Sequence, residues 1–212
     1  MLVVEGLVAG YGGQPLARLA RLSVQSGRTA LLLGPSGSGK TTLLMALAGL
    51  AQTLEGVVKV DGTDMATLDG AARDRHRGRS IGLVLQDLHL VAGLSAVDNI
   101  LLAPFAAGVA QDRRRALTLL EQLGLGARAH APAETLSRGE SQRTAIARAM
   151  LLRPKLILAD EPTASLDDAS CVRVLELLAA AASETGAALV IATHDLRLRG
   201  HTDLTVEAEP LS

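Results

Sequence analysis

The sequence predicts an α/β fold in which a mostly parallel sheet is covered by helices on both faces. Three observations lead to this fold class. A glycine- and serine-rich turn at residues 34–39 joins an apolar run to a segment of helix-forming residues. The runs at 155–159 and 187–193 are almost wholly apolar, and segments with helical spacing alternate with them. Strands buried on both faces lose polar alternation, so these runs are expected to pair in parallel.

The N-terminal part of the chain has a different pattern. Residues 2–8 and 16–24 mix apolar and polar positions and flank a Gly-Tyr-Gly-Gly turn, which predicts two strands. Residues 56–60 predict another strand, which an Asp-Gly turn follows. Tyr11 lies on the first turn, where side chains are usually exposed. It either covers the turn or offers a flat π-surface to a nucleotide base.

The most specific local motif is the loop after the first apolar run. Its sequence GPSGSGKT fits the phosphate-binding pattern G-x-x-x-x-G-K-[ST] at every fixed position. Glycines let backbone N–H groups curl around phosphate oxygens, and the helix N-terminus adds partial positive charge. Lys40 is expected at the β- and γ-phosphates and Thr41 on Mg²⁺. The alternative is an ordinary glycine turn with a surface lysine. The residues concerned are Gly34, Pro35, Ser36, Gly37, Ser38, Gly39, Lys40, Thr41 and Thr42.

The middle of the chain predicts one strand and an inserted pair of helices. Arginines alternate between positions 73 and 79, which indicates a solvated face, with contact to nucleic acid or lipid headgroups as the alternative. Residues 80–85 are strand-like and deliver Gln86 to the C-terminal end of a strand, where ligands bind in open α/β sheets. Apolar spacing predicts helices at 95–108 and 112–123, the second capped by an aspartate.

Capping signals mark two later helices. Ser137 begins one that extends to residue 152, and Glu140 stands three residues after it, which is capping-box spacing. The other helix spans 167–185, begins at an aspartate and ends before Gly186.

Polar residues follow three of the predicted strands. They are Gln86, the pair Asp160-Glu161, and His194. The first acid of such a pair can hold Mg²⁺, and the second can deprotonate an attacking water. Taken singly, adjacent acids can cap a helix and a lone histidine is more often packed. Together, after a phosphate loop, these residues indicate a nucleotide-hydrolysing site.

Composition excludes several classes of protein. The net charge is −1 over 212 residues, so no overall field draws the chain to nucleic acid. Cys171 is the only cysteine, which excludes an internal disulfide, and we expect it to pack inertly. The N-terminus does not look like a secretory signal, and no apolar run reaches the roughly 18–20 residues that cross a bilayer. We therefore expect a soluble, cytoplasmic protein.

Five segments occur in an order that is typical of one family. They are GPSGSGKTT from Gly34, Gln86 after an apolar strand, LSRGESQRTAIARAM from Leu136, LILADEPTASLDD from Leu156, and ATHD ending at Asp195. Over practically its whole length the chain resembles the nucleotide-binding subunit of ATP-binding cassette (ABC) transporters. The LSxGE helix is the most specific segment, because other phosphate-loop ATPases lack it.

The resemblance implies a P-loop NTPase fold of the ABC type. Its core sheet would be mostly parallel, with an N-terminal antiparallel β portion and a helical subdomain. Residues 1–212 would form one ABC ATPase domain without a C-terminal regulatory domain. The core and β portion would comprise about 1–87 and 155–212, and the helical subdomain about 88–154.

The resemblance also implies a role for each matching residue. The cofactors would be ATP and Mg²⁺, with Tyr11 stacked on adenine and the phosphate loop on the phosphates. The residues assigned to the metal are Thr41, Gln86 and Asp160. Those assigned to catalysis are Lys40, Gln86, Glu161 as general base, and His194. Those assigned to ATP held between two subunits are Ser137, Gly139 and Asp167.

Two kinds of partner follow from the resemblance. In the family two ATPase subunits close head to tail on two ATP molecules, so a second copy of this chain or a related subunit is expected. Integral membrane permease subunits would dock a short helix into a groove lined by about residues 87–105, on the cytoplasmic face of the membrane. For Phe105, core packing is the main expectation and the groove the alternative. No nucleic acid is expected. The chain looks most like the branch serving lipoprotein release, macrolide export and cell division.

One departure and three alternatives complete the sequence interpretation. Arg138 replaces a glycine of the common LSGGQ pattern, so we expect some backbone strain and retained activity at a reduced rate. The main alternative is a soluble ABC-type ATPase acting on nucleic acid or ribosomes, supported only by the arginine run at 73–79. A phosphotransferase would leave the LSRGE helix unexplained. A binding-only subunit is disfavoured by the complete set of catalytic residues.

Overall fold

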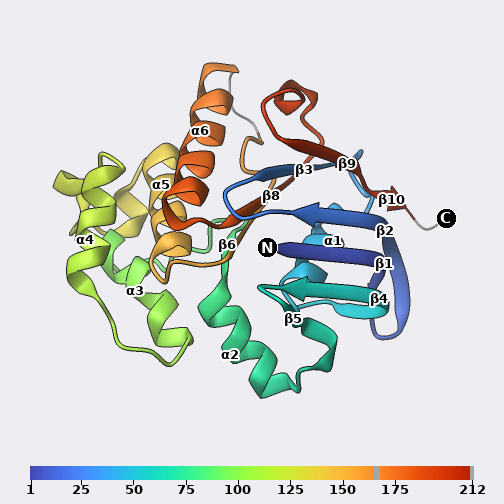
Figure 1. Ribbon diagram of the computed structural model, residues 1–212. Helices are drawn as coiled ribbons and strands as arrows, with labels where there is room; N and C mark the ends of the chain where they lie inside the picture. The colour runs from blue at the N-terminus through green and yellow to red at the C-terminus, as the bar shows by residue number, and fades with distance from the viewer. Residues whose placement is uncertain (165–167, 211–212) are drawn as a thin grey trace.

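Two five-stranded sheets and six α-helices form the part of the chain that the computed structural model describes, residues 1–164 and 168–210 (Figure 1). The strands are β1 Leu2–Tyr11, β2 Gln14–Val24, β3 Thr29–Leu33, β4 Gln52–Val60, β5 Thr63–Asp64, β6 Ile81–Val84, β7 Leu156–Asp160, β8 Ala188–Thr193, β9 Leu204–Glu207 and β10 Glu209–Pro210. The helices are α1 Lys40–Leu47, α2 Gly70–Ser80, α3 Ala96–Ala106, α4 Arg113–Gln122, α5 Arg138–Met150 and α6 Asp168–Thr185.

The first sheet is parallel throughout, with strand order β6-β7-β8-β3-β9. Its three central strands, β7, β8 and β3, are buried along their whole length. Apolar side chains therefore cover both faces of these strands, as the lack of polar alternation predicts. The predicted parallel core sheet is confirmed.

The second sheet is antiparallel, with order β10-β2-β1-β4-β5. The predicted N-terminal strands form its central hairpin, and β4 begins at residue 52, earlier than the sequence indicates. The sequence interpretation missed β5, β9 and β10. All three are short, and the residues of β5 and β9 are exposed or only partly buried, so they carry no apolar run.

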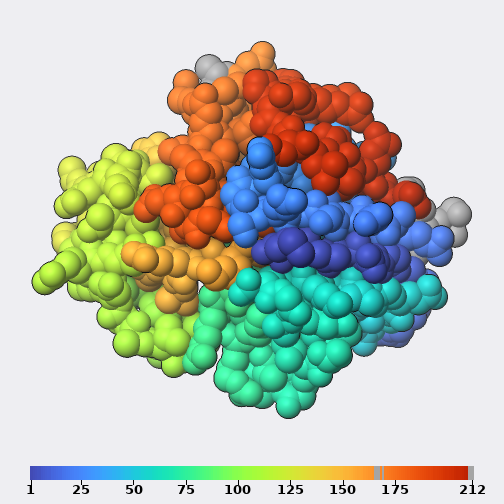
Figure 2. Space-filling model, in the orientation of Figure 1, coloured from blue at the N-terminus to red at the C-terminus, as the bar shows by residue number. Residues whose placement is uncertain are grey.

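Two aliphatic cores lie on opposite faces of the parallel sheet. Successive side chains of β3 point to opposite faces of the sheet, so Leu31 belongs to one core and Leu32 to the other. One core contains residues of α3 to α6, and the other fills the space around α1 next to the antiparallel sheet. In Figure 2 the yellow-green segment that includes α3 and α4 forms a lobe beside the sheets.

The helix boundaries follow local capping chemistry. The Asp112 side chain accepts from the Arg115 N–H at 2.9 Å at the start of α4, and Gly124 ends this helix region with φ +70°. At α5, Ser137 and Glu140 form the predicted capping box. These signals act within a few residues, so the sequence predicts them well.

Two features of the helices differ from the sequence interpretation. The basic stretch at 73–79 lies inside α2, a helix with no buried residue and therefore no apolar spacing to reveal it. Phe105 is 73% exposed on α3, so the expectation that it packs in the core is wrong.

The close contact of β6 with α5 provides a test of packing. A Cβ built on Gly82 would lie 2.5 Å from the main-chain oxygen of Ala149, so either the strand or the helix has to shift. We expect Gly82→Ala to lower the free energy of unfolding by about 1–3 kcal/mol, as overpacking does. Urea denaturation followed by circular dichroism measures this difference.

Gly70→Ala is the matched control, because a Cβ at Gly70 has no atom within 4 Å. Its unfolding free energy should equal that of the parent protein or exceed it by up to about 1 kcal/mol, because alanine reduces the conformational freedom of the unfolded chain. Equal effects of the two substitutions would contradict the packing argument.

Candidate functional site

The phosphate loop connects β3 to α1 and requires glycine at defined positions. Gly37 and Gly39 have φ of +81° and +82°, a region that L-residues rarely adopt. At Gly39 an added Cβ would also stand 2.4 Å from the Cβ of Ala17. The loop backbone can therefore curl beneath the antiparallel sheet only because these side chains are absent.

Lys40 places its ammonium inside this curl. Its Nζ donates to the carbonyl oxygens of Gly34 at 2.9 Å and Pro35 at 3.0 Å, and it lies 3.5 Å from Glu161 Oε1. The side chain is 6% exposed, so this positive charge is held at one place by oxygen atoms. Phosphate oxygens are chemically equivalent partners for it.

The end of β7 and the start of α1 meet through oxygen atoms. Thr41 Oγ1 donates to Asp160 Oδ2 at 2.9 Å. The other carboxylate oxygen, Asp160 Oδ1, is buried and lacks a hydrogen-bond partner in the described part of the chain. Burial is the main cause that raises the pKa of Asp160.

This donor set fits Mg²⁺, which prefers hard oxygen ligands and few protein carboxylates. An orphaned buried carboxylate oxygen beside a threonine hydroxyl is what such a cation would satisfy. Within residues 1–164 and 168–210, no group of three or more His, Cys, Asp or Glu residues could hold a metal. A cation here would therefore depend on phosphate oxygens and water for its remaining ligands.

Glu161 is fixed from two sides directly after β7. Its Oε1 lies 2.9 Å from His194 Nδ1, and its Oε2 accepts from the Thr193 hydroxyl at 2.9 Å. Its φ is +44°, which is uncommon for a residue with a side chain and typical of strained functional positions. The carboxylate is thereby aimed toward Lys40, while the His194 ring remains 53% exposed.

Thr193 is a site residue that the sequence interpretation missed. It is fully buried at the end of β8, and its hydroxyl donates to Glu161 while accepting from the Asp195 N–H at 3.0 Å. Thr193 stands immediately before His194 at the end of an apolar strand, and this position could have identified it as a residue of the site.

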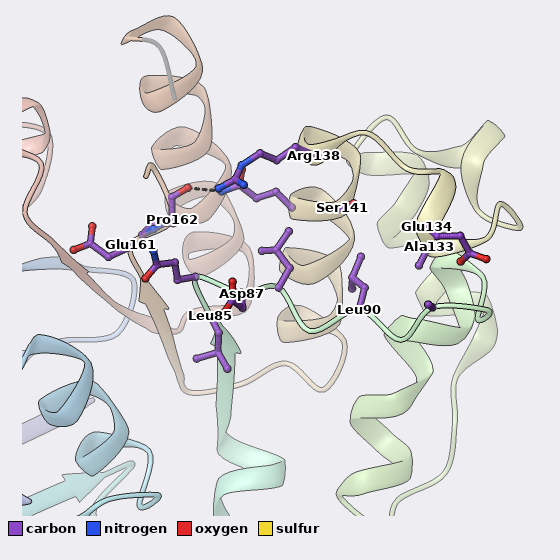
Figure 3. A pocket seen from close by; sticks show the side chains of 13 residues that line it. Leu85, Asp87, Leu90, Ala133, Glu134, Arg138, Ser141, Glu161 and Pro162 are labelled. Atoms are coloured by element: carbon purple, nitrogen blue, oxygen red, sulfur yellow. Dashed lines mark hydrogen bonds between the residues drawn. The ribbon is translucent and has the colours of Figure 1, made fainter. Parts of the chain in front are cut away.

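Gln86 follows β6 and is exposed on the wall of a cavity of about 340 Å³. Glu161, Arg138 and Ser141 line the same cavity (Figure 3). In the described part of the chain the Gln86 side chain forms no hydrogen bond, so it is free to adopt another orientation. The structure thus brings Gln86 and Glu161 to one cavity.

The LSRGE segment presents exposed residues at the N-terminus of α5. Ser137, Arg138 and Gly139 are all exposed, and the Arg138 guanidinium lies 3.4 Å from the carbonyl oxygen of Ala164. The expected backbone strain at Arg138 is wrong. Among the described residues other than glycine, positive φ occurs only at Asp61, His89, Arg153 and Glu161.

Two nucleotide-site predictions lie outside this cluster. Tyr11 ends β1 and is 48% exposed, as expected for a side chain available to a ligand. Asp167 falls outside the described residues.

A partly buried acid, Asp195, supports the segment after His194. The Asp195 carboxylate accepts from Arg197 Nη2 at 2.7 Å and from the Cys171 thiol at 3.4 Å. Hydrogen bonds from Arg197 lower the pKa of Asp195 to about 2. Burial raises the pKa of the Cys171 thiol, which agrees with the expected inert packing.

Comparison with known proteins settles the family. The protein-family model described as "ABC transporter" matches residues 18–164, more than half of the chain. The chain belongs to the ABC transporter family. Its fold is the ABC ATPase cassette, because a dimeric, post-hydrolysis ATP-binding cassette, MJ0796 bound to ADP and Pi, superposes with a TM-score of 0.84 at 30% identity. That alignment covers 99% of this chain and 94% of the other chain.

Curated relatives of this ABC ATPase carry transporter names. It is 43% identical over 212 residues to an uncharacterized ABC transporter ATP-binding protein of Mycobacterium tuberculosis. The aligned region covers 99% of this chain but only 63% of the length of that relative. It is 42% identical to the lipoprotein-releasing system ATP-binding protein LolD 1 of Rhodopirellula baltica, over 93% of this chain and 89% of that protein. Within the described residues no helix has the length and apolarity of a membrane span.

The lowered pKa of Asp195 predicts an effect of pH on the stability of the protein. Asp195 is ionised in the folded protein down to pH near 2, whereas its unfolded form binds a proton below about pH 4. Its stabilising contribution is therefore complete above pH 4 and lost as pH falls toward 2. We expect Asp195→Asn to reduce the loss of unfolding free energy between pH 5 and pH 2.5 by about 1–2 kcal/mol, measured by urea denaturation.

Asp74→Asn serves as the control, because Asp74 also pairs with an arginine, Arg77, at 2.7 Å but its side chain is 69% exposed. Exposed pairs contribute little. A parental pH dependence in Asp195→Asn, or the same change in both variants, would contradict the assignment.

Proposed function

We propose that this ABC ATPase hydrolyses Mg-ATP and couples its closure on nucleotide to movement of separate membrane-spanning permease subunits. The observation that carries the proposal is the meeting of Lys40, Asp160 and Glu161 at one edge of the parallel sheet. Positive charge, a metal-binding oxygen pair and a fixed carboxylate are the groups that phosphoryl transfer to water requires.

Each residue of the site has a specific part. Lys40 and the loop N–H groups would bind the β- and γ-phosphates. Thr41, Asp160 and Gln86 would together hold Mg²⁺. When bound, this ion would neutralise charge on the phosphate oxygens. Glu161 would orient a water and accept its proton, since Thr193 and His194 hold both carboxylate oxygens in place.

A second ATPase subunit would complete each site. Ser137 and Gly139 are exposed at the N-terminus of α5, whose partial positive charge suits the phosphates of ATP bound to the other subunit. Tyr11, 48% exposed, would stack on the adenine of the ATP bound by its own chain. Asp167 would contribute at the dimer contact. The second subunit is a copy of this chain or a related one.

We propose the permease contact at a groove between α2, α3 and α5. This groove encloses about 340 Å³ and is mainly apolar, with Leu83, Leu85 and Leu102 among its lining residues. Arg77, Arg79, His89 and Arg148 also line it. A short permease helix with an apolar face would complement this groove. Phe105 on α3, exposed and apolar, lies three residues from Leu102 and would extend the contact.

The branch of the family is also proposed. The named lipoprotein-releasing relatives match over nearly their whole length at 42% identity. We infer that this chain serves a membrane complex of the lipoprotein-release, macrolide-export and cell-division type, at the cytoplasmic face of the membrane.

The nucleic-acid alternative gains no support. Of its arginine run, Arg73 donates to the carbonyl oxygen of Leu68, and Arg77 pairs with Asp74. Positive charge that is already engaged contributes less to phosphate binding.

A base-deficient variant tests the proposed function. Glu161→Gln keeps the phosphate and metal contacts and removes the proton acceptor, so we expect turnover to fall by roughly 10²–10⁴-fold while ATP binding persists. Captured from detergent-solubilised native membranes with Mg-ATP, this variant should bring an integral membrane protein in stoichiometric amount.

The control is the same variant carrying Lys40→Ala, which should no longer bind ATP or assemble in response to it. Recovery of nucleic acid or ribosomal proteins alone, without a membrane protein, would contradict the transporter function and favour the soluble alternative.

The groove has its own test. Phe105→Ala in the Glu161→Gln background should reduce copurification of the membrane protein at least tenfold, since buried aromatic anchors often contribute 2 kcal/mol or more, on the order of a 30-fold change in affinity. Leu196→Ala is the control, because Leu196 is also exposed, at 64%, but lies in the turn after His194. Equal recovery with both variants would exclude Phe105 from the contact.

A further inference from the structure

The segment between β6 and α3 carries Gln86 and has no regular secondary structure, so side chains must hold its main chain. Asn99 of α3 fixes one end. It is fully buried, its Oδ1 accepts from the Val91 N–H at 2.7 Å, and its Nδ2 donates to carbonyl oxygens that include Val91 and Leu94. The other end, next to Gln86, depends on α5.

Arg148, in the last turn of α5, holds that other end. Its Nη2 donates to the carbonyl oxygen of Leu88 at 2.6 Å and its Nη1 to that of His89 at 2.9 Å. His89 has φ +46°, a left-handed conformation that is unfavourable for a residue with a side chain. The planar guanidinium thus donates to two successive carbonyl groups where the main chain adopts a left-handed conformation.

The surroundings of Arg148 indicate that these two bonds are strong. Burial lowers its pKa, and no carboxylate in the described part of the chain lies within 4.0 Å of its guanidinium. The positive charge is therefore satisfied by carbonyl oxygens in place of an acid. Charge-assisted hydrogen bonds of this kind are stronger than neutral ones, and of the two the bond to Leu88 is partly shielded from water whereas the bond to His89 is exposed.

The same helix contacts the other parts of the site. Gln142, nearly buried, donates from Nε2 to the carbonyl oxygen of Pro162 at 2.5 Å, in the turn after Glu161 (dashed in Figure 3). The N-terminus of α5 carries Ser137, roughly 16 Å from Arg148 at 1.5 Å per residue. One helix therefore joins the Gln86 segment, the Glu161 turn and the surface proposed for the second subunit.

We propose that Arg148 is a positioning residue, which fastens the Gln86 segment to α5 so that Gln86 and the Ser137 end of the helix move as one body. The inference rests on the proposed role of Gln86 at the metal and the attacking water. It assigns Arg148 no contact with nucleotide. Its loss would release Gln86 from the site while leaving the phosphate loop intact.

The first experiment reads the position of the segment without reference to activity. Amide hydrogen exchange of residues 85–91 is measured by mass spectrometry in the full chain. In Arg148→Met and Arg148→Lys the exchange should accelerate by roughly tenfold or more, because two charge-assisted bonds are lost or weakened. The lysine variant keeps the charge and the stem, so it retains folding even where methionine does not.

Arg115→Met is the matched control. Arg115 also donates from its guanidinium to a main-chain carbonyl near the end of α5, that of Leu151, at 3.0 Å. No hydrogen bond or ion pair joins the Arg115 side chain to residues 85–91, all of which the structure describes. The exchange of 85–91 should stay at the parental rate in this variant.

The second experiment reads the consequence for catalysis. Steady-state ATP hydrolysis is measured for Gln86→Ala, Arg148→Lys and the double variant. If Arg148 acts through Gln86, each single variant lowers kcat by roughly 10–100-fold with KM for ATP unchanged, and the double variant is no slower than Gln86→Ala. Arg115→Met keeps the parental kcat.

The results of these experiments distinguish the role of Arg148 from the proposed role of Gln86 in hydrolysis. Unchanged exchange at 85–91, acceleration that Arg115→Met matches, or multiplicative losses of kcat in the double variant would each overturn the role of Arg148. Should Gln86→Ala keep the parental kcat, the proposed part of Gln86 in hydrolysis fails, and hydrogen exchange alone decides whether Arg148 holds the segment.

Discussion

The parallel register of β3, β7 and β8 is the constraint on which the site depends. Leu33 pairs with Thr193, and Asp160 pairs with Ala192, so neighbouring strands end at one edge of the sheet. Strands in a sheet lie about 4.8 Å apart. The turns that follow them therefore bring the phosphate loop, the carboxylate pair and the His194 segment within reach of one another. A one-residue slip in any strand would turn these side chains to the opposite face.

The charges at this edge are partly compensated, which suits a site that receives both an anion and a cation. Lys40 is held by carbonyl oxygens and by Glu161, while Asp160 keeps one buried oxygen without a partner. A fully buried charge without partners is costly, so each group is held by neighbours that a phosphate or a metal can replace or supplement. The left-handed backbone of Glu161 fits the same picture, since strained residues concentrate at functional sites.

The helices on one face of the parallel sheet extend this edge toward two surfaces. α5 begins beside the exposed residues Ser137, Arg138 and Gly139, and it contacts the segments after β6 and β7 through Arg148 and Gln142. The groove between α2, α3 and α5 opens on the same side of the chain as the segment after β6. One helix thus contacts the proposed nucleotide site, the proposed subunit surface and the proposed permease groove, which would give a physical basis for coupling between them.

Features that depend only on local chemistry could be predicted from the sequence. The glycines of the phosphate loop, the capping box at Ser137 and the apolar central strands follow from requirements within a few residues, and the predicted fold class and family are confirmed. Features that depend on contacts between distant parts of the chain could not be predicted, because only the tertiary structure determines them. The exposure of Phe105 depends on which surfaces the helices leave open, and the short strands β5, β9 and β10 depend on neighbouring strands with which they pair. The backbone of Arg138 is unstrained because this residue lies in the first turn of α5. Glu161, which accepts from Thr193, and the partners of Arg148 are residues distant in the chain, and only folding brings those atoms into hydrogen-bond range.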